Sequence, residues 1–221
     1  PYTHSGILAS SVAMNKDRAK TLFRDAGLPV TDHLILKKDF KINEIPFIFP
    51  CVLKPISGGS SLDVHILNCK EDWLKNSIHG TERASKFMVE PFIPGRELTV
   101  TVMGNKALTV TDILSDKWYD YDAKYESGGS RHILPAGIPQ DIKELCLSYA
   151  LAAHNALGCR GVSRIDFRWN EMLHKDGLFI LELNTQPGMT PTSLVPEQAK
   201  YMGIAFEKLC TWLINDASCD R

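Results

Sequence analysis

Residues 161–190 read GVSRIDFRWNEMLHKDGLFILELNTQPGMT, and polar and apolar side chains alternate in two parts of this stretch. Successive side chains of a β-strand point to opposite faces of the sheet, so the alternation predicts strands over residues 162–169 and 178–185. The apolar face of each strand can pack on a hydrophobic core. We therefore expect two neighbouring strands whose polar side chains share one face.

The polar faces of these two strands combine an arginine, two carboxylates and an amide. The residues are Arg164, Asp166, Glu182 and Asn184. Leu181 and Leu183 are expected on the opposite, apolar face. Carboxylate and amide oxygens suit Mg²⁺, which completes its shell with water and substrate phosphates, and two acids this close repel each other unless a cation lies between them. The alternative is a solvated polar face on an edge hairpin.

Outside this stretch, the chain shows further helical and strand patterns. Apolar spacing and end signals predict helices over residues 15–26, 71–79, 142–156 and 206–213. Apolar or alternating runs predict strands over residues 30–36, 51–54, 63–67, 87–92, 97–103 and 107–114. Helices and antiparallel strands in this order indicate an α+β chain of two lobes. The tail after Asn215 is expected to fray.

Residues 115–139 have no usable period and carry Trp118, Tyr119, Tyr121 and Tyr125. Loops longer than roughly 12–15 residues are uncommon in compact domains and are usually lids or linkers. A linker is typically rich in Gly, Ser and Pro and poor in aromatic residues. The segment is therefore interpreted as a lid, with a linker as the alternative.

The composition is that of an ordinary globular chain. Of 221 residues, 44% are hydrophobic and 23% are charged, and the formal net charge is −1. These values argue against disorder and against a broad basic surface for nucleic acid. No apolar run approaches the roughly 18 residues of a membrane-spanning helix, so we expect neither a nucleic-acid nor a membrane partner.

Six cysteines are scattered without a Cys-x-x-Cys pair. A chain of this length can bury a sufficient core without disulfides, so reduced and mostly buried thiols in a cytoplasmic protein are expected. No signal peptide is visible. The chain starts at Pro1 and its first methionine is Met14, so we expect it to begin inside a longer protein.

A glycine-serine segment over residues 57–61 separates two predicted strands and suggests a hairpin with an open tip. Gly58 and Gly59 allow backbone amides to approach an anion, and Ser60 and Ser61 add hydroxyl donors. Lys54 ends an apolar run, where a half-buried ammonium needs an anionic partner. The alternative is an ordinary hairpin tip, and the segment is not a P-loop, because Gly-Lys-Ser/Thr is absent.

Lys16 lies in the first turn of a predicted helix, where the helix dipole disfavours a cation. A phosphate near this helix start would explain its position, and the alternative is an exposed lysine.

Glu90 and Glu97 flank the turn PFIPG at residues 91–95. Phe92 and Ile93 can offer an apolar slot with free backbone groups, as a planar heterocycle requires. The alternative is a pair of surface glutamates at strand ends.

Together these residues resemble the ATP-grasp D-alanine–D-alanine ligases, and the likeness extends along essentially the whole chain in the family's order. The matching motifs are residues 1–6, 14–16, 54–61, 121–125, 161–166 and 182–196, with Glu90 and Glu97. The resemblance implies two lobes of antiparallel sheet with flanking helices, and ATP bound between them. It also implies ligation of two D-alanines through an acyl phosphate, for peptidoglycan synthesis in the bacterial cytoplasm.

The resemblance further implies the ligands of ATP. Lys16 and Lys54 would hold the phosphates, with Lys124 reaching the γ-phosphate from the lid. The backbone at Pro91 and Ile93 would meet adenine. The remaining nucleotide ligands would be Ser61, Phe92, Glu90 and Glu97.

Metal and substrate positions follow from the same resemblance. Asp166, Glu182 and Asn184 would bind two Mg²⁺ ions, with Mn²⁺ as a substitute. Arg164 and the N–H of Gly188 would stabilise the tetrahedral oxyanion. The second D-alanine would bring its carboxylate to Ser193 and Leu194.

Lid closure would bring Tyr125 toward Ser60, and a tyrosine at this position goes with alanine as the second substrate in the family. Residues 1–90 would form the central lobe and residues 91–221 the C-terminal lobe. The family's N-terminal domain, through which members commonly form homodimers, is not in this chain. The alternatives are therefore an ATP-binding module without turnover and an ATP-grasp ligase with another acceptor.

Overall fold

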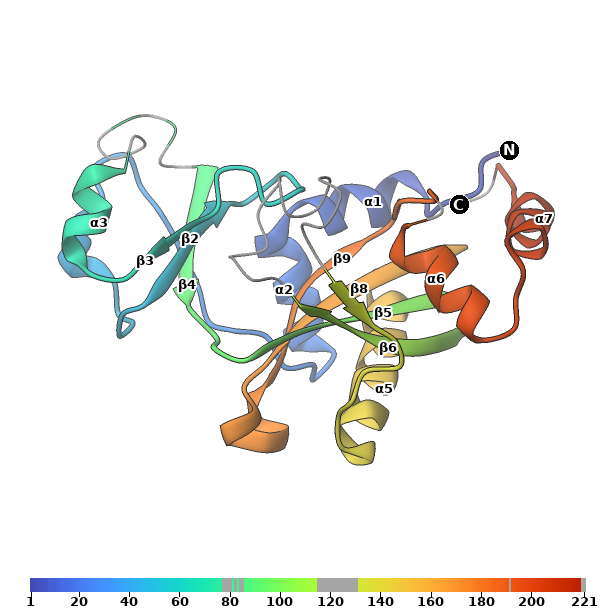
Figure 1. Ribbon diagram of the computed structural model, residues 1–221. Coiled ribbons are helices and arrows are strands. Elements are labelled where there is room, and N and C mark those ends of the chain that lie inside the picture. Colours follow the sequence, from blue (N-terminus) through green and yellow to red (C-terminus); the bar gives the residue numbers. More distant parts are fainter. Residues whose placement is uncertain (77–80, 82, 84–85, 115–130, 191, 220–221) are drawn as a thin grey trace.

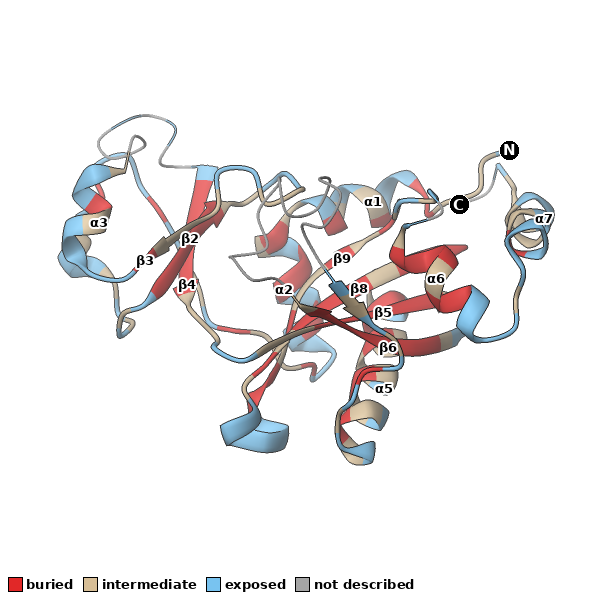
Figure 2. Ribbon diagram, viewed as in Figure 1, coloured by how far each residue is buried: buried red, intermediate tan, exposed pale blue. Residues whose placement is uncertain are grey.

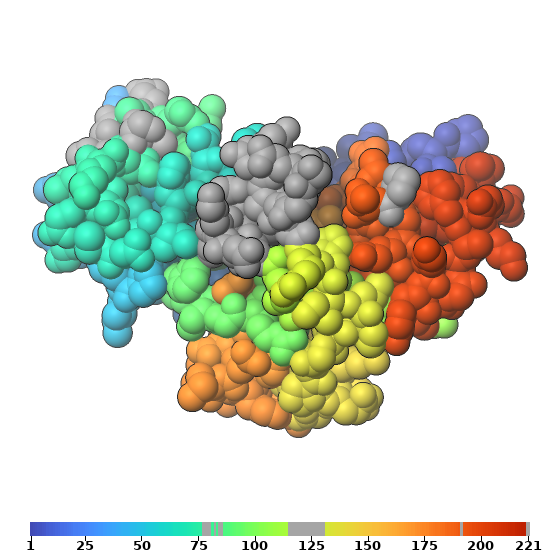
Figure 3. All heavy atoms as spheres, in the orientation of Figure 1, coloured from blue at the N-terminus to red at the C-terminus, as the bar shows by residue number. Residues whose placement is uncertain are grey.

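The computed structural model describes residues 1–76, 81, 83, 86–114, 131–190 and 192–219. Its architecture consists of two antiparallel sheets, each covered by helices (Figure 1). In the space-filling view of Figure 3, the cyan surface of the smaller lobe lies on the left, and the yellow and red surface of the larger lobe lies on the right.

The larger sheet has five strands in the order β7-β6-β5-β8-β9. They are β5 (Arg96–Met103), β6 (Lys106–Leu114), β7 (Arg131–Ile133), β8 (Val162–Trp169) and β9 (Leu178–Asn184). Helix α5 (Gln140–Ala156) packs its apolar side against one face of the sheet. Helix α6 (Leu194–Tyr201) lies on the other face, where the Gln198 side chain bonds to the β5 backbone.

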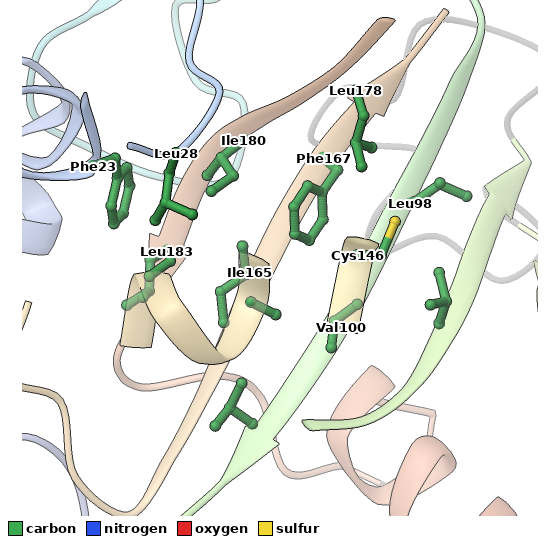
Figure 4. Packing of buried hydrophobic residues seen from close by; sticks show 14 of the residues in the cluster. Phe23, Leu28, Leu98, Val100, Cys146, Ile165, Phe167, Leu178, Ile180 and Leu183 are labelled. Carbon is green, nitrogen blue, oxygen red and sulfur yellow. The ribbon is translucent and has the colours of Figure 1, made fainter. Parts of the chain in front are cut away.

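Helices α1 (Ile7–Met14) and α2 (Lys16–Asp25) cover the β9 edge of this sheet. Phe23 lies beside Ile180 and Leu183 in the core (Figure 4). Helix η3 (Glu171–Gly177) joins β8 to β9, and α7 (Phe206–Asp216) packs Leu209 into a small cluster with α6.

The smaller sheet has four strands in the order β1-β4-β2-β3. They are β1 (Leu34–Ile35), β2 (Cys51–Pro55), β3 (His65–Leu67) and β4 (Phe87–Pro91). The short helices η1 (Ile42–Glu44) and α3 (Lys70–Lys75) belong to the same lobe. The Trp73 ring meets Phe40 edge-on, with ring centroids 5.4 Å apart. Buried residues concentrate along the central strands of both sheets (Figure 2).

Most predicted elements are confirmed, with small shifts at their ends. The helix predicted over 15–26 is α2, and Asn15 caps it by accepting a hydrogen bond from the Arg18 N–H. The two strands of the opening motif are β8 and β9. The division of the chain at residue 90 stays a prediction, and α1 and α2 share the core of the larger sheet although they precede it.

Several expectations were wrong. Helices α1 and α6 were not predicted, and only residues 34–35 of the strand predicted over 30–36 form a strand. Residues 131–133, inside the segment interpreted as a lid, form strand β7 against β6. Residues 115–130 of that segment lie outside the described residues. The tail after Asn215 is not frayed along its whole length, because Ser218 forms a β-bridge with Tyr2.

Leu181 also departs from the expected alternation. Asp166 pairs with Glu182, but Phe167 pairs with Ile180, so Leu181 is the extra residue of a β-bulge. A bulge inserts one residue into one strand and re-aims the side chains around it. Leu183 is in the core as expected, whereas Leu181 is only half-buried and lines a pocket beside Glu182.

All six cysteines lie in the described part of the chain, and none forms a disulfide, as expected. Only Cys51, Cys146 and Cys159 are buried, so the expectation of mostly buried thiols was wrong. Among the helices that the structure describes, none has the length and apolar character needed to cross a bilayer.

Gln198 provides a test of how α6 is fixed to the sheet. Its side chain is fully buried, accepts a hydrogen bond from the Thr101 N–H at 2.8 Å, and donates to the Thr99 carbonyl at 3.1 Å. Thr101 lies between Val100 and Val102 of β5, at the point where the pairing of β5 with β6 shifts register. Gln198→Ala should therefore lower the free energy of unfolding by about 2 kcal/mol or more, because buried backbone groups lose their partners.

Urea denaturation of the chain measures this effect. Gln140→Ala, at an exposed position of α5, is the matched control and should change the free energy of unfolding by less than about 0.5 kcal/mol. Equal values for the two variants would contradict the role given to Gln198.

Candidate active site

A pocket lies where the two sheets meet, and both contribute to its walls. Its lining residues include Lys54, Glu90 and Phe92 from the smaller lobe and Asp166, Arg168 and Glu182 from the larger lobe. Lys16 of α2 and Gly58, Gly59 and Ser61 of the predicted anion loop also line it. Residues from distant parts of the sequence are thus brought to one cavity.

Glu90 is the buried centre of the charges at this junction. Its carboxylate is ion-paired with Lys54 through Oε1 and with Lys20 through Oε2. The Thr31 hydroxyl donates to the same Oε2 at 2.9 Å and accepts from the Lys20 ammonium. Both side-chain oxygens of Glu90 thus have partners within the protein, and Glu90 also lines the pocket, so its contact with a nucleotide stays a prediction.

The charges of this cluster shift one another's pKa. Burial alone would raise the pKa of Glu90, but the ammonium groups of Lys54 and Lys20 overcome it and lower the pKa to about 2. Burial lowers the pKa of Lys20 to about 8, with Glu90 opposing and Lys54 adding to the shift. Glu90 is therefore ionised at neutral pH, as its ion pairs with Lys20 and Lys54 require.

Lys16 connects the start of α2 to the glycine-serine loop. Its Nζ donates to the Gly58 carbonyl at 2.8 Å and lies 3.5 Å from Glu182 Oε2. Its backbone N–H bonds to the Ile56 carbonyl at 2.8 Å. Burial lowers the pKa of Lys16, and Glu182 opposes this shift. Lys16 is therefore not the exposed lysine of the alternative interpretation.

The predicted anion loop is present between β2 and β3. Gly58, Ser60, Ser61 and Asp63 have positive φ angles. Non-glycine residues adopt such angles rarely, and clusters of them occur at functional sites. Gly58, Gly59 and Ser61 line the pocket, whereas Ser60 is not among its lining residues.

The polar face of the last two strands is also present. Asp166 lies directly opposite Glu182, and Arg164 lies opposite Asn184. Arg164 binds Asp166 with two hydrogen bonds of 2.8 and 2.7 Å, and the Thr99 hydroxyl donates to Asp166 at 2.6 Å. Asp166 and Glu182 both line the pocket.

The oxygen-bearing side chains of this face fit a magnesium ion only in part. Over the described residues, no group of three His, Cys, Asp or Glu side chains is placed to hold a metal ion. The protein instead offers two carboxylates, Asp166 and Glu182, directly opposed on neighbouring strands, with the Asn184 amide one pair along the ladder. The Glu182 side chain is 32% exposed, so it is accessible from the pocket. Two carboxylates and an amide suit a Mg²⁺ ion that also takes phosphate oxygens.

Part of the pocket wall is apolar. Val52, Phe92, Ile93 and Leu181 line it. The Phe92 N–H bonds to the Pro50 carbonyl at 3.1 Å. An apolar slot with backbone groups at its rim can bind a planar heterocycle.

Arg168 is a residue of the pocket that the sequence interpretation missed. It donates to the Ile93 carbonyl at 3.1 Å and to the Gly95 carbonyl at 2.8 Å, and its guanidinium lies 5.7 Å from the centre of the Phe92 ring. Glu97 lies 3.8 Å from it. The alternation that selected Arg164 and Asp166 continues to Arg168 and could have identified it.

The predicted acceptor residues lie in the loop after β9. Ser193 Oγ accepts from the Thr190 N–H at 3.1 Å, and a Cβ atom added to Gly188 would lie 2.8 Å from it. Leu194 is buried at the start of α6. Gly188, Ser193 and Leu194 are not among the lining residues of the pocket. Lys124 and Tyr125 lie outside the described residues.

The family model described as "D-ala D-ala ligase C-terminus" matches residues 22–215. The D-alanine–D-alanine ligase of Ruegeria sp. (strain TM1040) is 55% identical over 221 residues, covering 100% of this chain and 72% of the relative. The crystal structure of the D-alanine–D-alanine ligase from Bacillus anthracis is 31% identical with a TM-score of 0.84, covering 98% of this chain and 71% of that one. Its complex with ATP is 29% identical with a TM-score of 0.81, covering 98% and 70%.

Two α+β lobes of antiparallel sheet with a pocket of lysines and carboxylates between them define the ATP-grasp fold, as expected. Within that fold, the chain belongs to the D-alanine–D-alanine ligase family.

The low pKa of Glu90 gives a prediction on acid stability. The usual pKa is 4.5 and the folded-state value is about 2, so the folded state releases the proton more readily than the unfolded chain. The stability that Glu90 contributes is present above pH 4.5 and is lost as the pH falls toward 2. Glu90→Gln leaves two buried ammonium groups without a counter-charge and should cost about 3–5 kcal/mol at pH 7.

Urea denaturation at pH 7, 4 and 3 measures this dependence. The difference in unfolding free energy between the unmodified chain and Glu90→Gln should shrink as the pH falls below 4.5. Glu144→Gln, on the exposed side of α5, should show no such change. A difference that is constant over this pH range would contradict the charge arrangement.

Proposed function

We propose that the pocket binds ATP and that its residues carry out the ATP-dependent joining of two D-alanines. The observation that supports this is the distribution of charge along one cavity. One cavity is lined by lysines, the glycine-serine loop, the carboxylates Asp166 and Glu182 and several apolar side chains, and Lys16 lies 3.5 Å from Glu182. The relatives are named for this activity, and the structure of one of them contains ATP.

The nucleotide is proposed to lie along the pocket. Adenine would stack against Phe92 and Leu181 and meet the backbone near Ile93, while Arg168 holds the Ile93 and Gly95 carbonyls in place. Lys16 and Lys54 would bind the phosphates at the other end. Burial keeps both ammonium groups in a low-dielectric setting, where their attraction for phosphate is stronger than in water.

The reaction has two steps. The carboxylate of the first D-alanine attacks the γ-phosphorus of ATP, which forms an acyl phosphate and releases ADP. The amine of the second D-alanine then attacks the acyl carbon and loses a proton, the tetrahedral intermediate collapses, and phosphate leaves. Enzymes accelerate such steps mainly by positioning and by stabilising developing charge.

Each step uses particular side chains. Asp166, Glu182 and Asn184 would hold Mg²⁺, which neutralises charge on the transferred phosphoryl group when bound. Arg164 donates two hydrogen bonds to Asp166 and so would present a fixed guanidinium for the oxyanion of the second step. Gly188 would add its N–H, and Ser193 with the start of α6 would receive the carboxylate of the second D-alanine. Binding of two Mg²⁺ ions, their exchange for Mn²⁺, homodimer formation and a cytoplasmic location are parts of the proposal that rest on the family likeness.

Phosphate release in the presence of ATP, Mg²⁺ and D-alanine tests the function directly. Glu182→Gln should lower D-alanine-dependent release at least 100-fold, because a metal ligand loses its charge. Glu207→Gln, at an exposed position of α7, is the matched control and should leave the rate unchanged. Nucleotide binding without D-alanine-dependent release would favour the non-catalytic alternative instead.

The acceptor loop gives a second test. A methyl group at Gly188 would push against Ser193 Oγ, so Gly188→Ala should shift the proposed acceptor site. We expect the KM for D-alanine to rise about tenfold or more, because small displacements at a site are costly, while the KM for ATP changes less than twofold. Gly137→Ala adds a methyl group where nothing lies within 4 Å and is the control. An equal rise of both KM values would contradict the assignment.

A further inference from the structure

We propose that Lys20 is a positioning residue for the phosphate site. It forms an ion pair with Glu90 on the side that faces the core, and it thereby keeps the charge of Lys54 available to ATP. This inference rests on the proposed function, because it assumes that the pocket binds ATP. Lys20 cannot touch the nucleotide itself, since it is 1% exposed and is not among the residues that line the pocket.

The hydrogen bonds of Lys20 show what it holds. Its ammonium donates to the Thr31 carbonyl at 3.2 Å, to the Thr31 hydroxyl and to Glu90 Oε2. An ammonium has three donors, and all three are used inside the protein. Thr31 in turn donates to Oε2, so this oxygen of Glu90 is satisfied without Lys54.

The other oxygen of Glu90 faces the pocket lysine. Lys54 is ion-paired with Oε1, and its side chain lies at the pocket wall. Because Lys20 and Thr31 hold the carboxylate from behind, Oε1 is fixed and Lys54 is fixed with it. A lysine side chain otherwise has large rotamer freedom, which binding would have to restrict.

The charge count gives the electrostatic part of the argument. Two ammonium groups share one carboxylate, so the buried cluster has a net charge of +1. Without Lys20, Lys54 and Glu90 would cancel each other. The other pocket lysine, Lys16, already lies 3.5 Å from the carboxylate of Glu182. The positive charge that attracts phosphate at Lys54 therefore depends on a lysine that never contacts it.

A role in stability alone is the competing explanation. A buried ion pair often contributes little net stability, and its partners can be replaced by apolar residues of similar volume. The two explanations differ in what the loss of Lys20 does to ligand binding. A merely structural residue would affect ATP and adenosine alike, whereas a residue that tunes the phosphate site would affect ATP alone.

Calorimetric titration of the chain with ATP and with adenosine separates them. Lys20→Met should raise the Kd for ATP about tenfold and change the Kd for adenosine less than twofold. Arg18→Met removes a positive charge from the exposed side of the same helix and is the matched control, with no change expected for either ligand. Thr31→Val keeps the net charge and should weaken ATP binding only about threefold or less.

A double variant keeps the test decisive if Lys20→Met alone does not fold. Lys20→Met with Glu90→Gln removes both buried charges and leaves Lys54 with its own charge of +1. The Kd for ATP should then exceed that of the unmodified chain by clearly less than tenfold, because Lys54 regains its charge but loses the Glu90 oxygen that fixes it.

Three results would overturn the inference: an unchanged ATP affinity in Lys20→Met, an equal loss for ATP and adenosine, or a double variant that binds ATP no better than the single one. If the unmodified chain bound neither ligand, the proposed function would fail as well. The two failures are thus distinguishable.

Discussion

A single buried carboxylate, Glu90, joins the two lobes of this protein. It lies on β4 of the smaller sheet, and it binds Lys54 on the neighbouring strand and Lys20 on α2, a helix that packs in the core of the larger sheet. Removal of the Glu90 carboxylate would leave two buried ammonium groups without a counter-charge. The relative position of β4 and α2 is therefore constrained by charge as well as by apolar packing.

This junction also determines where the pocket lies. The backbone of Lys16 bonds to the glycine-serine loop through Ile56, one helical turn before Lys20. The start of α2 thus fixes both the loop and the lysines, while β8 and β9 bring the carboxylates from the other lobe. Residues proposed to bind phosphate and residues suited to a metal meet because two sheets, each with its own core, share one helix.

The sequence predicted strands β8 and β9, the hairpin and many of the residues that line the pocket, because strand alternation and glycine-serine turns are local signals. It could not place Leu181, since a β-bulge depends on how β9 pairs with β8 and not on the residues of β9 alone. Lys20 was missed for a similar reason: a lone lysine on an amphipathic helix indicates an exposed position unless the tertiary partner, here Glu90, is known. Helix α1 was not predicted because its sequence, ILASSVAM at residues 7–14, has no clear apolar stripe.

In the proposed site, the groups that fix the charged side chains are distinct from the groups that would contact the substrate. Lys20 and Thr31 are buried, and Arg164 is fixed by the hydrogen bonds that it donates to Asp166, one of the proposed metal ligands. A positive group that is fixed before the substrate arrives needs no reorganisation when charge develops during the reaction, and such preorganised electrostatics is commonly the largest contribution to catalysis. The cost is paid in folding free energy, because each buried ion must be desolvated. The low pKa of Glu90 and the lowered pKa of Lys20 both follow from placing these charged groups together in the protein interior.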